Sequence, residues 1–223
     1  MWMADACRCV VLVSGSGSNL QALLDRAAEG TLGAEVAAVV SNRADAYALE
    51  RARAAGVATQ VVDHTAFPDR AAFDGALKEA VAGFEPDLVV MAGFMRVLTP
   101  DFVASFEGRL INVHPSLLPA FRGLHTHRKA LEEGCRIHGT TVHFVTEDLD
   151  AGPIIAQAAL RVLDTDTPDS LRHRVQALEH RLLPQAVHWY AQGRLRTEAQ
   201  RVSVAHHPDS PGELFAPAPE AEC

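Results

Sequence analysis

Two side chains suited to catalysis stand close together near the middle of the chain. Asn112 and His114 are two residues apart in the apolar run Arg109–His114, and residues with that spacing on a strand project from the same face. An amide donor beside an imidazole can hold a developing oxyanion while a proton is transferred. A lone histidine at a strand end is more often structural. The neighbouring amide, and a following loop stiffened by Pro115 and Pro119, are what favour catalysis here.

A carboxylate that could join this pair lies in the acidic turn Glu147–Pro153. Within the turn, Asp150 precedes Ala-Gly-Pro, where the constrained backbone favours an inward side chain. A carboxylate near an imidazole keeps the ring oriented and favours its protonated form. An ordinary turn aspartate is the alternative, and it would be preferred if this segment stood alone. We therefore predict that Asn112, His114 and Asp150 form one catalytic group.

A glycine-rich loop follows the first apolar run. Residues 14–20, Ser-Gly-Ser-Gly-Ser-Asn-Leu, let successive backbone N–H groups point inward, and the next helix, with Ser18 or Asn19 as candidate N-cap, adds its positive dipole end. An empty tight turn is the alternative. The loop lacks the Lys-Ser/Thr ending of a Walker motif and the third glycine of the dinucleotide fingerprint, and segment 41–43 contains no acid. A monophosphate therefore fits the loop better than a dinucleotide.

Neither the histidines nor the cysteines are spaced as metal ligands. His125 and His127 form an H-x-H pair, but no cysteine or acid stands at a ligand spacing from it, so we predict no metal site. The four cysteines form no CxxC pair, and we expect free thiols in a reducing compartment. The first residues do not resemble a signal peptide, and no run approaches the roughly 20 apolar residues of a membrane span. We therefore predict a cytoplasmic protein.

Short apolar runs alternate with helical patterns and predict a doubly wound α/β fold. Such alternation is typical of a mostly parallel sheet that is covered on both faces. The expected strands cover residues 9–13, 36–40, 58–62, 87–92 and 110–113. The expected helices between them cover residues 20–28, 44–55 and 68–82.

The pattern changes after the fifth expected strand. Residues 140–145 and 154–163 are strand-like and separated by a short turn, so we predict an antiparallel pair. A long final helix is expected from Pro168 to about Ala191. Residues 206–223 are rich in Pro, Ala and Glu without periodicity, which predicts a disordered tail after a single domain of residues 1–205. The whole pattern predicts a Rossmann-like fold with an antiparallel C-terminal strand pair.

The charge of the chain narrows the class of its partners. The formal net charge of −8 excludes a broad basic face for nucleic acid, because such binding requires clustered Lys and Arg opposite phosphates. A small anionic substrate is still compatible with this charge, since one local pocket can be positive while the whole surface is negative.

Four parts of the sequence resemble the phosphoribosylglycinamide formyltransferases, which have a Rossmann-like formyltransferase fold. These parts are residues 14–21, residues 91–98 (Met-Ala-Gly-Phe-Met-Arg-Val-Leu), residues 112–119 (Asn-Val-His-Pro-Ser-Leu-Leu-Pro), and residues 138–143 with 150–153. The resemblance spans roughly residues 8–198 in unbroken order. The wider folate formyltransferase group shares the Asn-x-His-Pro-Ser core. However, the tRNA enzyme of that group resembles this core plus a basic C-terminal barrel, and the deformylase carries an extra N-terminal domain.

The resemblance implies an activity and a role for each matched residue. It implies transfer of the formyl group of 10-formyltetrahydrofolate to glycinamide ribonucleotide in purine biosynthesis, with Asn112, His114 and Asp150 as catalytic residues. The residues implied for the ribonucleotide are Gly17, Ser18, Asn19, His125, Gln176 and Glu179. The residues implied for the folate are Arg70, Met95, Arg96, Val97, Leu98 and Asn112. In loop 119–123 the chain departs from the expected bacterial form, with Ala120 in place of a lysine, and Arg122 is the candidate for the missing charge.

Three other functions stay open at this point. A folate deformylase would use water in place of the amine. A nonenzymatic phosphate-binding module would need no convergence of Asn112, His114 and Asp150, and an NAD enzyme is disfavoured by the broken fingerprint. The partners implied by the resemblance are small molecules, and the sequence leaves both a monomer and a homodimer open.

Overall fold

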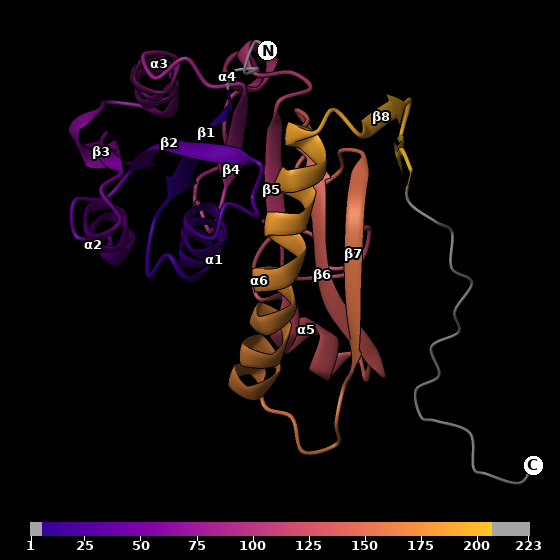
Figure 1. The fold of residues 1–223 in the computed structure, drawn as a ribbon. Helices are drawn as coiled ribbons and strands as arrows, with labels where there is room; N and C mark the ends of the chain where they lie inside the picture. The colour runs from indigo at the N-terminus through magenta and orange to yellow at the C-terminus, as the bar shows by residue number, and fades with distance from the viewer. Residues whose placement is uncertain (1–5, 207–223) are drawn as a thin grey trace, which may run out of the picture.

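A computed structural model of the chain describes residues 6–206, which form one continuous nine-stranded sheet with helices packed against it (Figure 1). The strand order is β3-β2-β1-β4-β5-β6-β7-β9-β8. The strands are β1 (Cys7–Val13), β2 (Ala34–Ser41), β3 (Ala58–Val61), β4 (Leu88–Met91), β5 (Leu110–His114), β6 (Ile137–Phe144), β7 (Ile154–Arg161), β8 (Leu195–Glu198) and β9 (Arg201–Val204). The helices are α1 (Ser18–Ala28), α2 (Tyr47–Ala54), the 3-10 helix η1 (His64–Ala66), α3 (Arg70–Ala82), α4 (Pro100–Ser105), α5 (Thr126–Glu132) and α6 (Pro168–Ala191).

The first five strands make a parallel sheet that winds outward in both directions from β1. Strand β1 pairs in parallel with β2 and with β4, and the outer pairs β2–β3 and β4–β5 are parallel too. The chain order reverses between β1 and β4, and ligands bind α/β sheets at the carboxyl ends of strands beside such a switch point. The doubly wound parallel sheet predicted from the sequence is confirmed. Its geometry brings the ends of β1, β4 and β5 to one edge.

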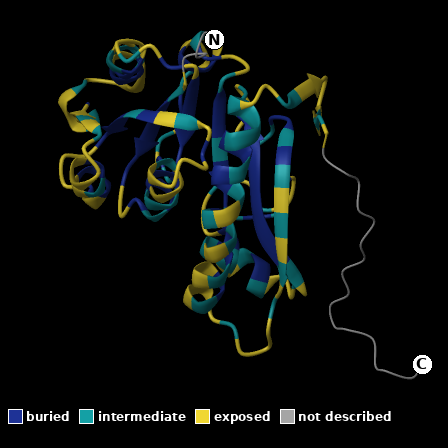
Figure 2. Ribbon diagram, viewed as in Figure 1, coloured by how far each residue is buried: buried dark blue, intermediate teal, exposed yellow. Residues whose placement is uncertain are grey.

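The side chains of β1 alternate between the two faces of the sheet and are apolar on both, which explains why helices cover both faces. Val11 and Val13 pack with buried side chains of α1, α2 and α6, whereas Val10 and Leu12 pack with those of α3 and α4. Successive side chains of a strand point to opposite faces, so an unbroken apolar run buries both. Figure 2 shows the buried residues concentrated in the sheet and the exposed ones on the outer turns of the helices.

The second half of the sheet is antiparallel. Strand β6 pairs antiparallel with β5 on one side and with β7 on the other, which confirms the predicted antiparallel pair. Helix α6 lies against β6 and β7 and also contacts α1 (Figure 1). It has the predicted extent, Pro168–Ala191, and begins with a capping box in which the Thr167 hydroxyl accepts a hydrogen bond from the backbone N–H of Ser170. This helix therefore joins the two halves of the sheet.

Three features differ from the sequence predictions. Helix α3 begins at Arg70, capped by the Asp69 carboxylate, so Pro68 precedes the helix rather than starting it. The short helices α4 and α5 were not predicted, because six or seven residues are too few to show a helical period. The hairpin β8–β9 was also missed, since its turn has Ala199 at a φ of 52° rather than the glycine or asparagine that signals such turns. The sheet therefore continues beyond the long helix.

Several sequence predictions reach beyond the described residues. Of the disordered tail expected at 206–223, His206 is described, and residues 207–223 lie outside the described part together with Cys223. The predicted single domain of residues 1–205 stays a prediction. Cys7, Cys9 and Cys135 are free thiols. Within residues 6–206, no helix combines the length and the apolar character needed to cross a bilayer.

The β6–β7 pairing depends on a residue without a side chain. A Cβ atom at Gly139 would lie 2.0 Å from the carbonyl oxygen of Ala158 and 2.9 Å from a methyl carbon of Leu117. We expect Gly139→Ala to lower the free energy of unfolding by about 2–4 kcal/mol, because the ladder must shift to admit the methyl group. Urea unfolding followed by circular dichroism measures this change.

Gly75→Ala is the matched control for this substitution. Gly75 lies inside α3, and no described atom outside its local helix stands within 4 Å of a Cβ built there. Alanine favours helix over glycine, so this variant should be more stable by up to about 1 kcal/mol. Equal stability of the Gly139→Ala variant and the unchanged protein would contradict the close approach.

Candidate active site

The glycine-rich loop between β1 and α1 is shaped by a close approach to α2. Gly17 has a φ of 71°, and a Cβ atom there would lie 2.5 Å from the Cβ of Ala48. The backbone N–H of Ala48 donates to the carbonyl of Gly15 at 3.0 Å, which fixes the loop against α2. Gly17 is the N-cap of α1 and, among the described residues, no side chain caps it, so the prediction of Ser18 or Asn19 as N-cap is wrong. The first N–H groups of α1 are therefore left for a ligand.

The side chains expected to cap α1 instead connect it to α6. Gln176 donates through Nε2 to Ser18 Oγ at 2.7 Å, and Asn19 donates through Nδ2 to Glu179 Oε2 at 2.8 Å. Glu179 is buried, and its desolvation raises the pKa of its carboxyl group despite the opposing hydrogen bond from Asn19. The structure thus brings together Gly17, Ser18, Asn19, Gln176 and Glu179, although helix α6 lies far along the chain from the loop.

A cavity of about 430 Å³ opens between this loop, the ends of the central strands and α6. It is large enough for a ribose phosphate and polar on the loop side. The lining residues that matter for the site are Gly17, Ser18, Asn19, Met95, Arg96, Gln176 and Glu179, together with Arg43, His127 and Arg172. The site therefore lies at the switch point of the sheet, where α/β folds bind their ligands.

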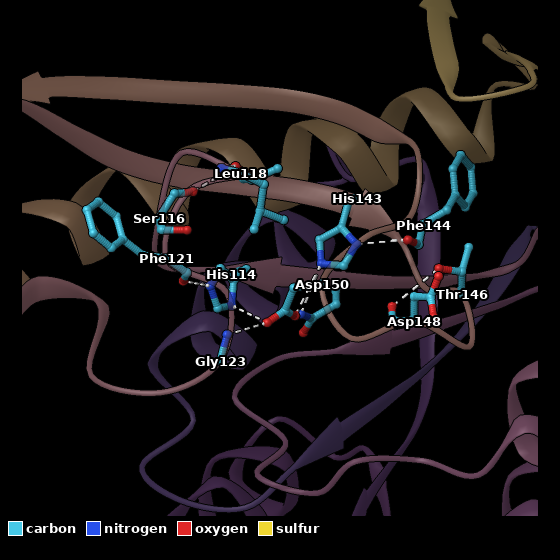
Figure 3. A network of polar contacts seen from close by, with 12 residues as sticks. His114, Ser116, Leu118, Phe121, Gly123, His143, Phe144, Thr146, Asp148 and Asp150 are labelled. Carbon is cyan, nitrogen blue, oxygen red and sulfur yellow. Dashed lines mark hydrogen bonds and ion pairs between the residues drawn. The ribbon is translucent and has the colours of Figure 1, made fainter. Parts of the chain in front are cut away.

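Two of the predicted catalytic residues, His114 and Asp150, face each other (Figure 3). His114 ends β5, and its Nδ1 lies 3.4 Å from Oδ2 of Asp150, which comes from the turn between β6 and β7. His114 Nε2 lies 2.9 Å from the carbonyl oxygen of Phe121, so both ring nitrogens face acceptors. The same Asp150 oxygen accepts the backbone N–H of Gly123 at 2.8 Å. The side chains of His114 and Asp150 are only 8% and 7% exposed, so this contact is shielded from water.

His143 completes the cluster, and sequence reasoning gave it no role. It stands opposite Asn112 in the β5–β6 pairing, and its Nε2 lies 3.3 Å from Nδ2 of Asn112. Its Nδ1 lies 2.8 Å from the carbonyl of Phe144, so Nδ1 carries the proton and Nε2 accepts from Asn112. Burial lowers the pKa of His143, which keeps the ring neutral. The ring therefore fixes the amide of Asn112 and leaves its second N–H free for a ligand.

A second, smaller hollow holds the residues expected to contact a folate. Arg96 lines both this hollow and the main cavity, whereas Val97 and Leu98 line the hollow with Asn112 and Asp150. The backbone N–H of Met95 donates to Ser14 Oγ at 2.8 Å, so segment 95–98 is anchored to the glycine-rich loop. The two openings thus have Arg96 in common.

Two predicted binding residues do not line either opening in the described part of the chain. His125 is exposed at the start of α5 with a φ of 63°, and Arg70 is exposed at the start of α3. His127 and Arg172 line the main cavity instead. Arg172 lies in the second turn of the long helix and carried no sequence signal, since a charged residue on a helix surface is usually solvated. His127 was noted in the H-x-H pair, but its direction depends on the packing of α5.

The fold and the site define an α/β group-transfer enzyme with a glycine-rich loop at its switch point and a cluster of Asn, His and Asp side chains beside it. Among the described residues, no three His, Cys, Asp or Glu side chains gather as metal ligands. The family described as formyl transferase matches residues 7–187. The chain belongs to the formyl transferase family.

Known relatives agree with this assignment over most of the chain. The phosphoribosylglycinamide formyltransferase of Escherichia coli (strain K12) is 52% identical over 187 residues, which cover 84% of this chain and 88% of that protein. The solved structure of glycinamide ribonucleotide transformylase 1 from Symbiobacterium toebii is 50% identical with a TM-score of 0.89, covering 92% of this chain and 97% of that one. The structure of phosphoribosylglycinamide formyltransferase from Coxiella burnetii is 47% identical with a TM-score of 0.85, covering 90% and 94%.

Two neighbouring histidines, the buried His138 and the partly buried His127, should make stability depend on pH. Burial lowers the pKa of His138 to about 4, and burial with the charges of His138, Arg172 and His114 lowers that of His127 to about 4. The unfolded chain titrates near 6.5, so between these values it binds more protons than the folded chain. Stability is therefore greatest above about pH 6.5 and falls as the pH drops towards 4, by roughly 1–3 kcal/mol.

Urea midpoints measured across this pH range check the prediction. His138→Asn removes one of the titrating groups, so its midpoint should fall less steeply with acid. His125→Asn is the control, because His125 is exposed and asparagine tolerates its left-handed backbone. A flat profile in the unchanged protein would contradict the assignment.

Proposed function

We propose that this chain transfers the formyl group of 10-formyltetrahydrofolate to the amine of glycinamide ribonucleotide, giving N-formylglycinamide ribonucleotide and tetrahydrofolate in purine biosynthesis. The observation that carries the proposal is the convergence of Asn112, His114 and Asp150 beside a cavity that contains an anion-binding loop. The names of the relatives support the choice of substrates.

The two openings offer one place for each substrate. The phosphate of the ribonucleotide sits on the N–H groups of Gly17, Ser18 and Asn19, and its ribose and glycinamide reach Gln176 and Glu179. The folate enters along segment 95–98, where the exposed Met95 and the half-exposed Val97 offer apolar surface. Its formyl group then lies at Asn112. Roles for His125 in binding phosphate and for Arg70 in binding the glutamate tail stay predictions.

The proposed chemistry is direct transfer without a covalent enzyme intermediate. The glycinamide nitrogen attacks the formyl carbon, and the new C–N bond forms as the carbonyl becomes a tetrahedral oxyanion. The free N–H of Asn112 donates a hydrogen bond to this oxyanion. The protonated His114, whose two N–H groups face Asp150 and Phe121, stabilises it through its positive charge. The bond from carbon to the folate nitrogen then breaks, and the amine's proton passes to that leaving nitrogen. Asp150 favours the protonated form of His114 and, through water, assists this proton transfer.

The proposal also specifies the partners of the enzyme, its compartment and its oligomeric state. The partners are small molecules rather than nucleic acid or membrane, and the enzyme works in the cytoplasm as a monomer or homodimer. A deformylase is the second candidate, because a water molecule in place of the amine would meet the same oxyanion-stabilising groups.

Substitutions in the cluster should lower turnover without unfolding the chain. We expect Asn112→Ala, His114→Ala and Asp150→Asn each to reduce kcat by about 10²–10³, because each weakens stabilisation of the transition state. Asp164→Asn is the control, since Asp164 is 88% exposed and far from the cluster in the fold. Steady-state kinetics with both substrates, together with circular dichroism of each variant, make the measurement. Near-normal formyl transfer by the His114→Ala variant would reject the assignment.

Tetrahydrofolate release in the presence and absence of glycinamide ribonucleotide separates the candidate functions. Release that requires the ribonucleotide supports the proposal. Release with water alone supports the deformylase, and ribonucleotide binding with formyl-folate left intact would indicate a nonenzymatic module.

A further inference from the structure

A phosphate dianion in the main cavity needs a full positive charge as well as backbone N–H groups. The one carboxylic acid that lines the cavity among the described residues, Glu179, has a raised pKa because of burial, and it would repel the phosphate if ionised. The N–H groups of the loop contribute partial charges at the start of α1. The arginines that line the cavity are the candidates for this positive charge.

Three arginines line the cavity in the described part of the chain. Arg43 is bound in bidentate fashion by Asp45, at 2.9 and 2.7 Å. Arg96 lies over the ring of Phe73 with its Cζ 5.8 Å from the ring centre, and it also lines the folate hollow. The guanidinium of Arg43 is thus paired with a carboxylate. Arg96 lines both openings, and its buried Nε has no hydrogen-bond partner among the described residues.

Arg172 contacts two exposed neighbours on α6. Its NH2 lies 3.0 Å from Nε2 of the neighbouring His173 and 3.5 Å from Asp169, whose side chain is 85% exposed. An exposed ion pair of this kind contributes little stability. The side chain of Arg172 is 47% exposed at the cavity wall, and most of its five donors have no partner among the described residues, so they can meet an anion.

The position of Arg172 on α6 points it at the anion-binding loop. It lies one helical turn before Gln176, and residues four apart share a face of a helix. Gln176 is bonded to Ser18 in that loop. The charge of Arg172 also lowers the pKa of His127, which lines the same cavity from α5, so both side chains face the same space. By contrast, Arg122 is exposed and does not line the cavity within the described residues.

We propose that Arg172 is the phosphate-binding cation of this site, its guanidinium donating two hydrogen bonds to the phosphate that rests on residues 17–19. The inference rests on the proposed function for the identity of the substrate, but its ligand class is any small phosphate monoester. Arginine suits this role because its planar fork matches two phosphate oxygens, whereas lysine offers a point charge. Arg122, the candidate from the sequence, is replaced in this role by a residue of the long helix.

Binding of ribose 5-phosphate and of inorganic phosphate tests the proposal without any chemistry. Isothermal titration at constant ionic strength compares the unchanged protein with Arg172→Gln, Arg172→Lys and the control Arg181→Gln. Arg181 is exposed on the same helix and does not line the cavity in the described structure, so its substitution changes the net charge equally. We expect Kd to rise about tenfold or more in Arg172→Gln, by less in Arg172→Lys, and by under about twofold in the control.

Kinetics with glycinamide ribonucleotide give an independent measure. Arg172→Gln should raise KM for the ribonucleotide about tenfold or more while kcat changes by less than about threefold, since the phosphate is bound equally in the ground and transition states. Equal Kd values in Arg172→Gln and Arg181→Gln would overturn the proposal, and so would a fall in kcat with unchanged KM.

These outcomes are distinguishable from a failure of the proposed function. Loss of phosphate binding in Arg172→Gln, in a protein that transfers no formyl group, would support the anion site and reject the substrate assignment. Unchanged phosphate binding in that variant, in a protein that does transfer the formyl group, would reject the role of Arg172 alone.

Discussion

The carboxylate of Asp150 holds three separate parts of the chain at one point. It accepts the N–H of Gly123 in the loop after β5, lies 3.4 Å from His114 at the end of β5, and faces His143 on β6 at 3.9 Å. Asp150 itself has a φ of 50°, a left-handed conformation imposed by the turn between β6 and β7. Because this carboxylate is nearly buried, its interactions are worth more than at the surface. The geometry of the cluster depends on this one group.

The pairing of β5 with β6 fixes the position of Asn112 in the same cluster. The antiparallel register of β5 and β6 places His143 opposite Asn112, and its neutral ring receives one N–H of the Asn112 amide. Two histidines with different surroundings therefore lie beside Asp150. His143 is neutral and buried and orients an amide, whereas His114 ends β5 and faces the carboxylate.

The glycine-rich loop depends on long-range contacts as well. Ser18 and Asn19 bind Gln176 and Glu179, which are separated from them by 158 and 160 residues. Helix α6 therefore braces the loop and adds polar groups to the cavity wall. A rigid cavity of this kind is expected where substrate must be positioned before transfer, since small displacements at such sites cost large factors in rate.

The amino-acid sequence by itself determined the local features of this protein. Alternating apolar runs specify the parallel strands, the glycines of residues 14–20 specify a tight loop before α1, and the signals at Pro168 and Gly193 bound α6. The motif of Asn112 and His114 identified the strand end that lies beside the cavity. These features depend on neighbours in the chain, which is why periodicity and turn chemistry reveal them.

Only the tertiary structure decided which distant side chains meet. The approach of His143 to Asn112 follows from strand register, the contact of α6 with the loop follows from helix packing, and the place of Arg172 in the cavity follows from both. Among the described residues no side chain caps α1, because the side chains expected to cap it bind α6 instead. The turn between β8 and β9 contains Ala199, a residue type that does not signal a turn. All of these contacts form because surfaces far apart in the sequence pack together, and no local sequence pattern specifies that packing.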